Sequence, residues 1–174
     1  PSDGTTSYPS PSGGAQYKHY VLTDESGSFR WVYCVESGVR FGSSDDGYYS
    51  EHTENSEYFN QLPKASQRGI MLTSLYGWQP GAAMPMSGIN NNDWYMAAQC
   101  IMWEYQQQLR SDPYSRQDNG QVEADTFYRV VKGRPAEKVY DWILEQITSH
   151  STIPSFAGET KSKAPTHELK WDPK

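Results

Sequence analysis

The spacing of apolar and aromatic positions changes along this chain, from a strand-like N-terminal part to helical segments after it. Residues 17–23 and 28–36 are rich in aromatic and β-branched residues. The turn-like segment Asp24-Glu25-Ser26-Gly27 separates them. This alternation of strand and turn signals predicts a β-hairpin that ends near Cys34.

Three later segments carry helical patterns. Residues 63–76 place apolar side chains at mixed helical spacing and end at Gly77, a favourable helix stop. A second helix is predicted to begin at a cap on Asn91 or Asn92, and Pro135 opens a third that runs through Ser149. The apolar stripe of the second helix has i, i+4, i+7, i+8 spacing and comprises Trp94, Ala98, Ile101, Met102, Tyr105 and Leu109. Tyr95, Gln99, Met102 and Trp103 fall on an adjoining face.

The remaining segments give weaker signals. Residues 127–132 are short and β-branched, which fits either a strand or a helix end, and residues 166–171 are predicted to form a final edge strand. The Gly, Ser and Asp of residues 42–56 predict a solvated surface loop, because the acidic cluster there lacks the ligand spacing of a calcium-binding loop. Residues 1–16 are predicted to be a flexible lead-in or linker, and residues 17–174 a single domain.

Charge and composition exclude several classes of function. The 174 residues carry a net charge of −6 and no Lys/Arg cluster, so nucleic acid is not an expected partner. No apolar run approaches the roughly 20 residues of a membrane-spanning helix, and no membrane insertion is expected. There is no glycine-rich phosphate motif, and the four histidines form no HExxH or close ligand pair. The sequence therefore predicts neither a metal nor a cofactor. Its first residues lack the regions of a signal peptide, as expected of an excised mature domain.

The most distinctive chemistry lies in two aromatic-rich segments, residues 29–36 and 94–103. The first contains Cys34 and the second contains Gln99. A cysteine thiolate held against a glutamine carboxamide can attack it, release ammonia and leave an internal thioester. The surrounding aromatic side chains would exclude the water that hydrolyses such a bond.

A disulfide is the simplest alternative, because the chain has two cysteines and a Cys34–Cys100 bridge would suit an extracellular protein. Without the flanking motifs, that bridge would be the favoured interpretation. Cys34 has one sulfur, and Gln99 and Cys100 point about 100° apart on a helix. A bond to one of them therefore excludes a bond to the other.

The two segments resemble the motifs of thioester domains in surface adhesins of Gram-positive bacteria. Tyr33-Cys34-Val35-Glu36 fits the aromatic-Cys-apolar-acidic motif, and Gln99, Met102 and Trp103 match a Thr-Gln-x-Ala-apolar-Trp motif. Ala98 and Ile101 replace its usual threonine and alanine. Residues 70–80 resemble a helix end and a Gly-aromatic-x-Pro turn found upstream of the glutamine. With these three motifs, the likeness covers roughly the core two thirds of the chain.

The resemblance implies a function and a fold. We expect an α+β domain in which a β core carries Cys34, a helical subdomain carries Gln99, and the thioester closes at their junction. We expect it to act outside the cell, on a bacterial surface, anchored to the cell wall through other parts of its parent protein. A lysine on a host extracellular or cell-surface protein would take the acyl group of Gln99 and free the Cys34 thiol. This single-turnover reaction is not enzymatic catalysis.

Proton transfer during such a reaction needs an acid or a base, and shelter from water. The candidates near the two motifs, for either role, are Tyr33, Glu36, Asp93, Trp103 and Glu104.

Two other functions remain open at this stage. One is a noncovalent ligand- or glycan-binding module, suggested by 13 tyrosines and 6 tryptophans in an acidic chain. The other is a cysteine enzyme in which one of the four histidines assists Cys34.

Overall fold

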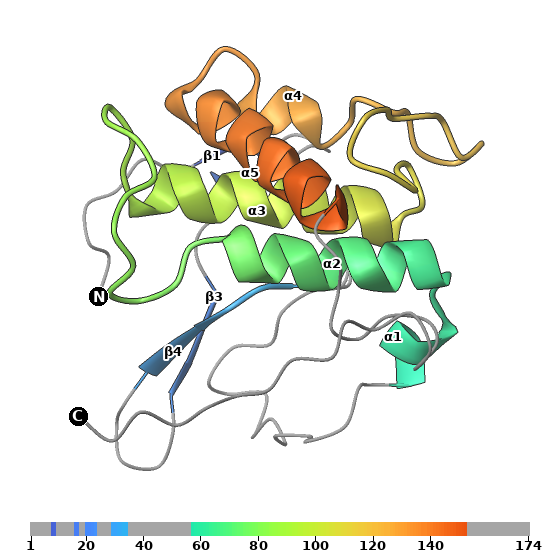
Figure 1. Ribbon diagram of the computed structural model, residues 1–174, viewed down its shortest axis with the longest axis horizontal. Helices are drawn as coiled ribbons and strands as arrows, with labels where there is room; N and C mark the ends of the chain where they lie inside the picture. The colour runs from blue at the N-terminus through green and yellow to red at the C-terminus, as the bar shows by residue number, and fades with distance from the viewer. Residues whose placement is uncertain (1–7, 10–15, 18–19, 24–28, 35–56, 153–174) are drawn as a thin grey trace.

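The computed structural model describes residues 8–9, 16–17, 20–23, 29–34 and 57–152. Two β-hairpins precede a helical body in the chain (Figure 1). The elements are β1 (Tyr8–Pro9), β2 (Gln16–Tyr17), β3 (Tyr20–Thr23), β4 (Phe29–Val32), α1 (Glu57–Gln61), α2 (Lys64–Tyr76), α3 (Asn91–Gln106), α4 (Tyr128–Val131) and α5 (Pro135–Thr152).

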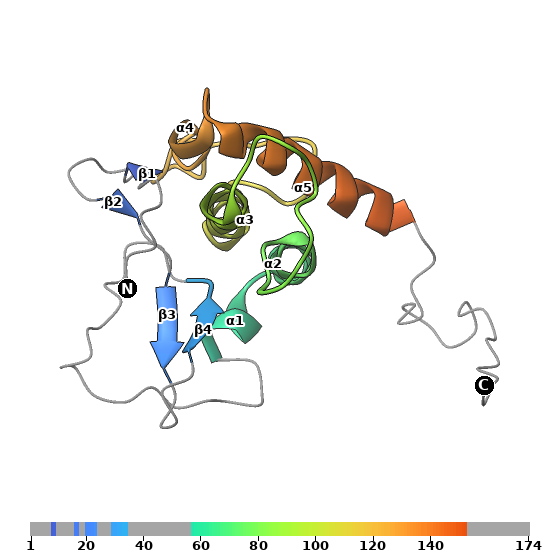
Figure 2. The ribbon, with the colours of Figure 1, turned by 90° about the vertical axis from the view of Figure 1, so that its left-hand side faces the viewer.

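Helix α3 is the centre of the molecule. Helices α2 and α5 pack against it, and the β3–β4 hairpin lies on the side of α3 opposite α5 (Figures 1 and 2). Every residue from Asn92 to Gln106 is buried, as expected for a helix surrounded by other elements. Gly69 lets α2 approach α3 closely, because a Cβ at this position would lie 2.3 Å from the Tyr105 ring.

The helices predicted from the sequence are confirmed, with small changes at their ends. Helix α2 begins one residue later than expected, and α5 extends to Thr152. Helix α3 is capped by Asn90 rather than by Asn91 or Asn92. The Asn90 side chain accepts a hydrogen bond from the Asp93 N–H at 3.0 Å, and the Asp93 carboxylate accepts one from the Asn90 N–H at 2.8 Å. This reciprocal capping box satisfies two N–H groups that would otherwise lack partners.

The ambiguous segment at residues 127–132 is helical, and forms α4. Its Val130 and Val131 are buried against the rest of the helical body. Packing thus decides between two conformations that the β-branched sequence left open.

The prediction of a β core is wrong. Strands β3 and β4 pair antiparallel with Val21 opposite Trp31, which confirms the predicted hairpin over a shorter length. However, the described strands form only two-stranded sheets, β1–β2 and β3–β4. Two strands cannot enclose a core. The described core is instead helical, built around α3, and the α+β class with a β core does not describe it.

Tyr8 packs into the helical body although it belongs to the segment expected to be a lead-in. Its side chain is buried, and its hydroxyl donates a hydrogen bond to Asp93 on α3. The guanidinium of Arg134 lies 5.5 Å from the centre of its ring. Tyr8 thereby ties the β1–β2 hairpin to the start of α3. The predicted loop at residues 42–56 and the predicted strand at residues 166–171 lie outside the described residues.

Among the helices of the described residues, none combines the length and apolar character that a membrane crossing requires.

Candidate functional site

Gln99 lies in the middle of α3 with its side chain 1% exposed, and the backbone of Cys34 holds its carboxamide. The Cys34 N–H donates to Gln99 Oε1 at 2.8 Å, and Gln99 Nε2 donates to the Cys34 carbonyl oxygen at 2.6 Å. The carboxamide oxygen can only accept a hydrogen bond and its nitrogen can only donate one, so the two bonds fix the orientation of the carboxamide. The two residues, 65 positions apart in the sequence, are therefore direct partners.

Cys34 follows the end of β4, and two tyrosines hold that end of the strand against α3. The Tyr95 hydroxyl donates to the Val32 carbonyl oxygen at 2.6 Å. The Tyr33 ring stacks on the Tyr95 ring with centroids 4.8 Å apart and an interplanar angle of 10°. Cys34 itself is partly exposed. Stacked aromatic rings thus shelter one side of the site, and Cys34 lies at its partly exposed side.

The turn after α2 closes a further side of the site. The Tyr33 hydroxyl donates to the Trp78 carbonyl oxygen at 2.9 Å, and Trp94 Nε1 donates to the Tyr76 carbonyl oxygen at 2.9 Å. Burial raises the pKa of Tyr33 well above its usual range, so its hydroxyl stays protonated and can donate. The Gly-aromatic-x-Pro turn within residues 70–80 therefore contacts Tyr33, the residue next to Cys34.

The arrangement can support acyl chemistry at the Gln99 carboxamide. A backbone N–H that donates to a carbonyl oxygen polarises the carbon and stabilises the negative charge that develops on nucleophilic attack. The Cys34 N–H has that position relative to Gln99 Oε1. Cys34, whose thiol is the nucleophile, thus also supplies the N–H that donates to the carbonyl oxygen under attack.

The structure does not join Cys34 and Cys100 in a disulfide. Cys100 is 0% exposed. Burial, together with the nearby Glu104 carboxylate, raises the pKa of the Cys100 thiol well above its usual range. Cys100 is therefore a buried, unreactive core residue.

The other acid, base and shielding candidates have varied positions. Tyr33 is beside the site, whereas Asp93 caps α3 and accepts from Tyr8. The Trp103 ring packs on Phe127, with centroids 5.5 Å apart. Glu36 lies outside the described residues.

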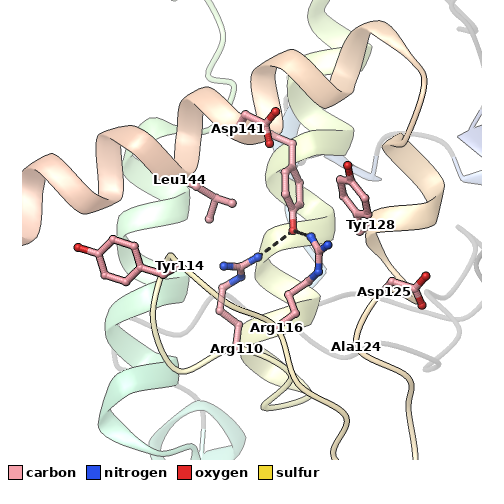
Figure 3. A pocket seen from close by; sticks show the side chains of 9 residues that line it. Arg110, Tyr114, Arg116, Ala124, Asp125, Tyr128, Asp141 and Leu144 are labelled. Atoms are coloured by element: carbon pink, nitrogen blue, oxygen red, sulfur yellow. Dashed lines mark hydrogen bonds between the residues drawn. The ribbon is translucent and has the colours of Figure 1, made fainter.

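Glu104 faces the α5 side of α3, away from the hairpin that carries Cys34. It is fully buried, accepts from Arg110 Nε at 3.0 Å and from the Tyr140 hydroxyl at 2.6 and 2.7 Å. Arg110 and Arg116 both donate to that hydroxyl, as the dashed lines in Figure 3 show. Burial raises the pKa of Glu104 above its ordinary value of 4.5, and the adjacent Arg110 opposes the rise. This cluster connects α3 to α5, and its members Arg110, Arg116 and Tyr140 line a pocket of about 340 Å³.

Among the four histidines, His150 is the one within the described residues. Its Nδ1 lies 3.0 Å from the Tyr76 hydroxyl, in a contact between α5 and the end of α2. His19, His52 and His167 lie outside the described residues.

Sequence reasoning gave Tyr95 only a share in the aromatic shelter of residues 94–103, although helical spacing placed it on the same face as Gln99. The signal available was the i, i+4 relation between the two residues. Its bond to Val32 follows only from the tertiary contact between α3 and the hairpin.

The thioester domain family matches residues 31–149, which is more than half of the chain. The chain belongs to this family, whose members bind covalently through a thioester and are typically parts of surface proteins. No curated protein and no solved structure is significantly similar to the chain.

Proposed function

We propose that this chain attaches a bacterium covalently to host tissue through a thioester between Cys34 Sγ and Gln99 Cδ. The observation that carries the proposal is the pair of hydrogen bonds between the Cys34 backbone and the Gln99 carboxamide. They hold the nucleophilic residue and its electrophile together within a family that uses such a bond. Proximity of this kind removes much of the entropic barrier to a reaction between two groups.

Bond formation begins when the Cys34 thiolate attacks Gln99 Cδ. The electron pair of the carbonyl moves to Oε1, where the Cys34 N–H donates to it. Collapse of the intermediate expels the nitrogen of the former carboxamide as ammonia, which leaves with the thiol proton. The product is the Cδ–Sγ thioester.

Target capture follows the same route with a different nucleophile. A lysine amine on a host surface protein attacks Gln99 Cδ, the C–S bond breaks, and the sulfur leaves as a thiol after taking the proton released by the amine. The new bond is an amide between the host lysine and the Gln99 side chain. The reaction occurs once per molecule and regenerates no thioester, so the domain is not an enzyme.

A covalent bond suits an adhesin, because its dissociation rate is effectively zero whereas noncovalent attachment lasts only as long as its residence time. A thioester alone would react with many amines. Specificity therefore requires a docking surface that raises the local concentration of the correct lysine. We propose that the domain is displayed outside the cell, with the cell-wall anchor elsewhere in the parent protein.

The test is covalent capture of lysine-bearing host surface proteins, read as a conjugate that survives boiling in detergent and reductant. We expect the wild-type chain and Cys100→Ala to form the conjugate, and Cys34→Ala and Gln99→Ala to form none. The Cys100→Ala variant is the matched control, because it removes the other cysteine and leaves the Cys34–Gln99 pair intact. Capture that persists in Cys34→Ala or Gln99→Ala would refute the proposal.

A further inference from the structure

The Tyr95 hydroxyl lies close to the oxygen that would carry negative charge during acyl transfer. It is 3.4 Å from Gln99 Oε1 and 2.6 Å from the Val32 carbonyl oxygen. A phenol has one proton to donate. The shorter contact takes that proton in this structure, and Gln99 Oε1 is a second acceptor near the same hydroxyl.

We infer that Tyr95 is a catalytic residue of the thioester site, acting as the second donor of an oxyanion hole whose first donor is the Cys34 N–H. This inference rests on the proposed Cys34–Gln99 thioester. It concerns both bond formation and capture of an amine, since each passes through a tetrahedral intermediate with its charge on Gln99 Oε1.

The reason is a difference between the ground state and the transition state. In the ground state the Tyr95 hydroxyl donates to a neutral acceptor, the Val32 carbonyl oxygen. When a nucleophile adds to Gln99 Cδ, Oε1 becomes an anion, and an anionic acceptor makes a hydrogen bond about twice as strong as a neutral one. The proton then turns from Val32 to Oε1. Only an interaction that strengthens in the transition state accelerates the chemical step, and this one does.

The position of Tyr95 is rigid enough for that role. It projects from the buried part of helix α3, and its ring is stacked on Tyr33 with centroids 4.8 Å apart. Replacement by phenylalanine keeps the ring and its stacking and removes only the donor. Loss of one oxyanion-hole donor typically lowers a rate by about 100- to 1,000-fold. Because the Cys34 N–H remains as the other donor, we expect a loss of at least about tenfold.

The experiment measures the second-order rate of methylamine uptake by intact mass for the wild type, Tyr95→Phe and Tyr58→Phe. Tyr58→Phe is the matched control, because the Tyr58 hydroxyl bonds another glutamine of α3, Gln106, at 2.6 Å. We expect Tyr95→Phe to slow uptake at least tenfold and Tyr58→Phe to leave it within twofold. Equal rates in the wild type and Tyr95→Phe would overturn the inference.

A second measurement separates chemistry from structure. Fluorinated tyrosine at position 95 keeps the hydroxyl and makes it a more acidic, stronger donor, so uptake should be faster than in the wild type below the pH at which the phenol ionises. An unchanged or slower rate there would contradict a donor role, even if Tyr95→Phe failed to fold. A wild-type chain that neither loses ammonia nor takes up methylamine would instead overturn the proposed thioester, and the role of Tyr95 with it.

Discussion

The Tyr33 hydroxyl occupies the space into which a side chain at position 77 would project. A Cβ added to Gly77 would lie 2.7 Å from the Tyr33 hydroxyl oxygen and 3.0 Å from the Ala98 Cβ. The φ of Gly77 is −70°, which any residue can adopt. Glycine is therefore needed here for space, where the sequence indicated a helix stop. It lets the turn after α2 approach the strand end that carries Cys34.

We expect Gly77→Ala to destabilise the fold by about 1–3 kcal/mol, the usual cost of overpacking. The added methyl group would displace Tyr33 from Trp78, and with it the neighbouring Cys34, so methylamine uptake should also fall. Thermal unfolding and intact mass measure the two effects. Gln79→Ala, an exposed change two residues away, should alter neither. Wild-type uptake in Gly77→Ala would show that this contact does not position Cys34.

Cys100 should be dispensable for the chemistry. It is fully buried and outside any disulfide, so Cys100→Ala should keep the wild-type uptake of methylamine and lose only about 1 kcal/mol of stability from the missing side-chain volume. Reductant should leave the unfolding temperature of the wild type unchanged. A large drop in that temperature on reduction would instead support the Cys34–Cys100 bridge.

Glu104 should matter for stability and not for reactivity. Glu104→Gln leaves the guanidinium of Arg110, 2% exposed, without its carboxylate. Breaking a buried ion pair typically costs about 3–5 kcal/mol. Denaturant unfolding would measure this loss, and the folded protein should still take up methylamine at the wild-type rate.

The control for that variant is an exposed ion pair. Arg129 contacts Glu123 at 2.5 Å with both side chains more than half exposed, so Glu123→Gln should change stability by less than about 1 kcal/mol.

A folded Glu104→Gln protein with no methylamine uptake would return Glu104 to the list of acid–base candidates.

Acid should loosen the start of α5 through Glu137. Its carboxylate accepts from the Tyr128 hydroxyl and from the Gly133 N–H at 2.7 Å, and these bonds lower its pKa below the ordinary 4.5. A carboxyl group with a lower pKa in the folded state stabilises the fold above its unfolded-state pKa. That stabilisation is lost as the pH falls through the folded-state pKa.

We therefore expect stability to decline below about pH 4.5, and Glu137→Gln to weaken this part of the decline. Unfolding curves between neutral and acidic pH provide the measurement. Glu145→Gln, which changes an exposed carboxylate of the same helix, should keep the wild-type profile. An identical acid profile in Glu137→Gln would contradict the role given to these bonds.

The helices were predictable from the sequence because the apolar residues of each recur at helical spacing within a short stretch of chain. The pattern that ends at Gly77 and the helix opened by Pro135 need no tertiary information, and both are present. The cap of α3 was misplaced because Asn90, Asn91 and Asn92 can all cap a helix. Only the position of Asp93, three residues after Asn90, completes a capping box.

Tertiary relationships were harder to predict. The hairpin was expected to belong to a larger β core, since strand propensity does not indicate how many strands pair. Tyr8 gave no signal, because a single aromatic residue in a Ser- and Pro-rich segment has no period. Glu104 was a candidate acid or base because of its place in the sequence, whereas its partners Arg110 and Tyr140 are brought together only by the packing of α3 with α5. The contact between Cys34 and Gln99 was anticipated through the resemblance to thioester domains, which periodicity alone would not have suggested.

The most direct test of the central claim is the intact mass of the denatured, unreduced wild-type chain before and after methylamine, with a count of thiols. A thioester between Cys34 and Gln99 predicts a mass lower than the sequence by one ammonia, then a gain of one methylamine and the release of one thiol. A mass equal to that of the sequence, with two thiols and no uptake of methylamine, would contradict it.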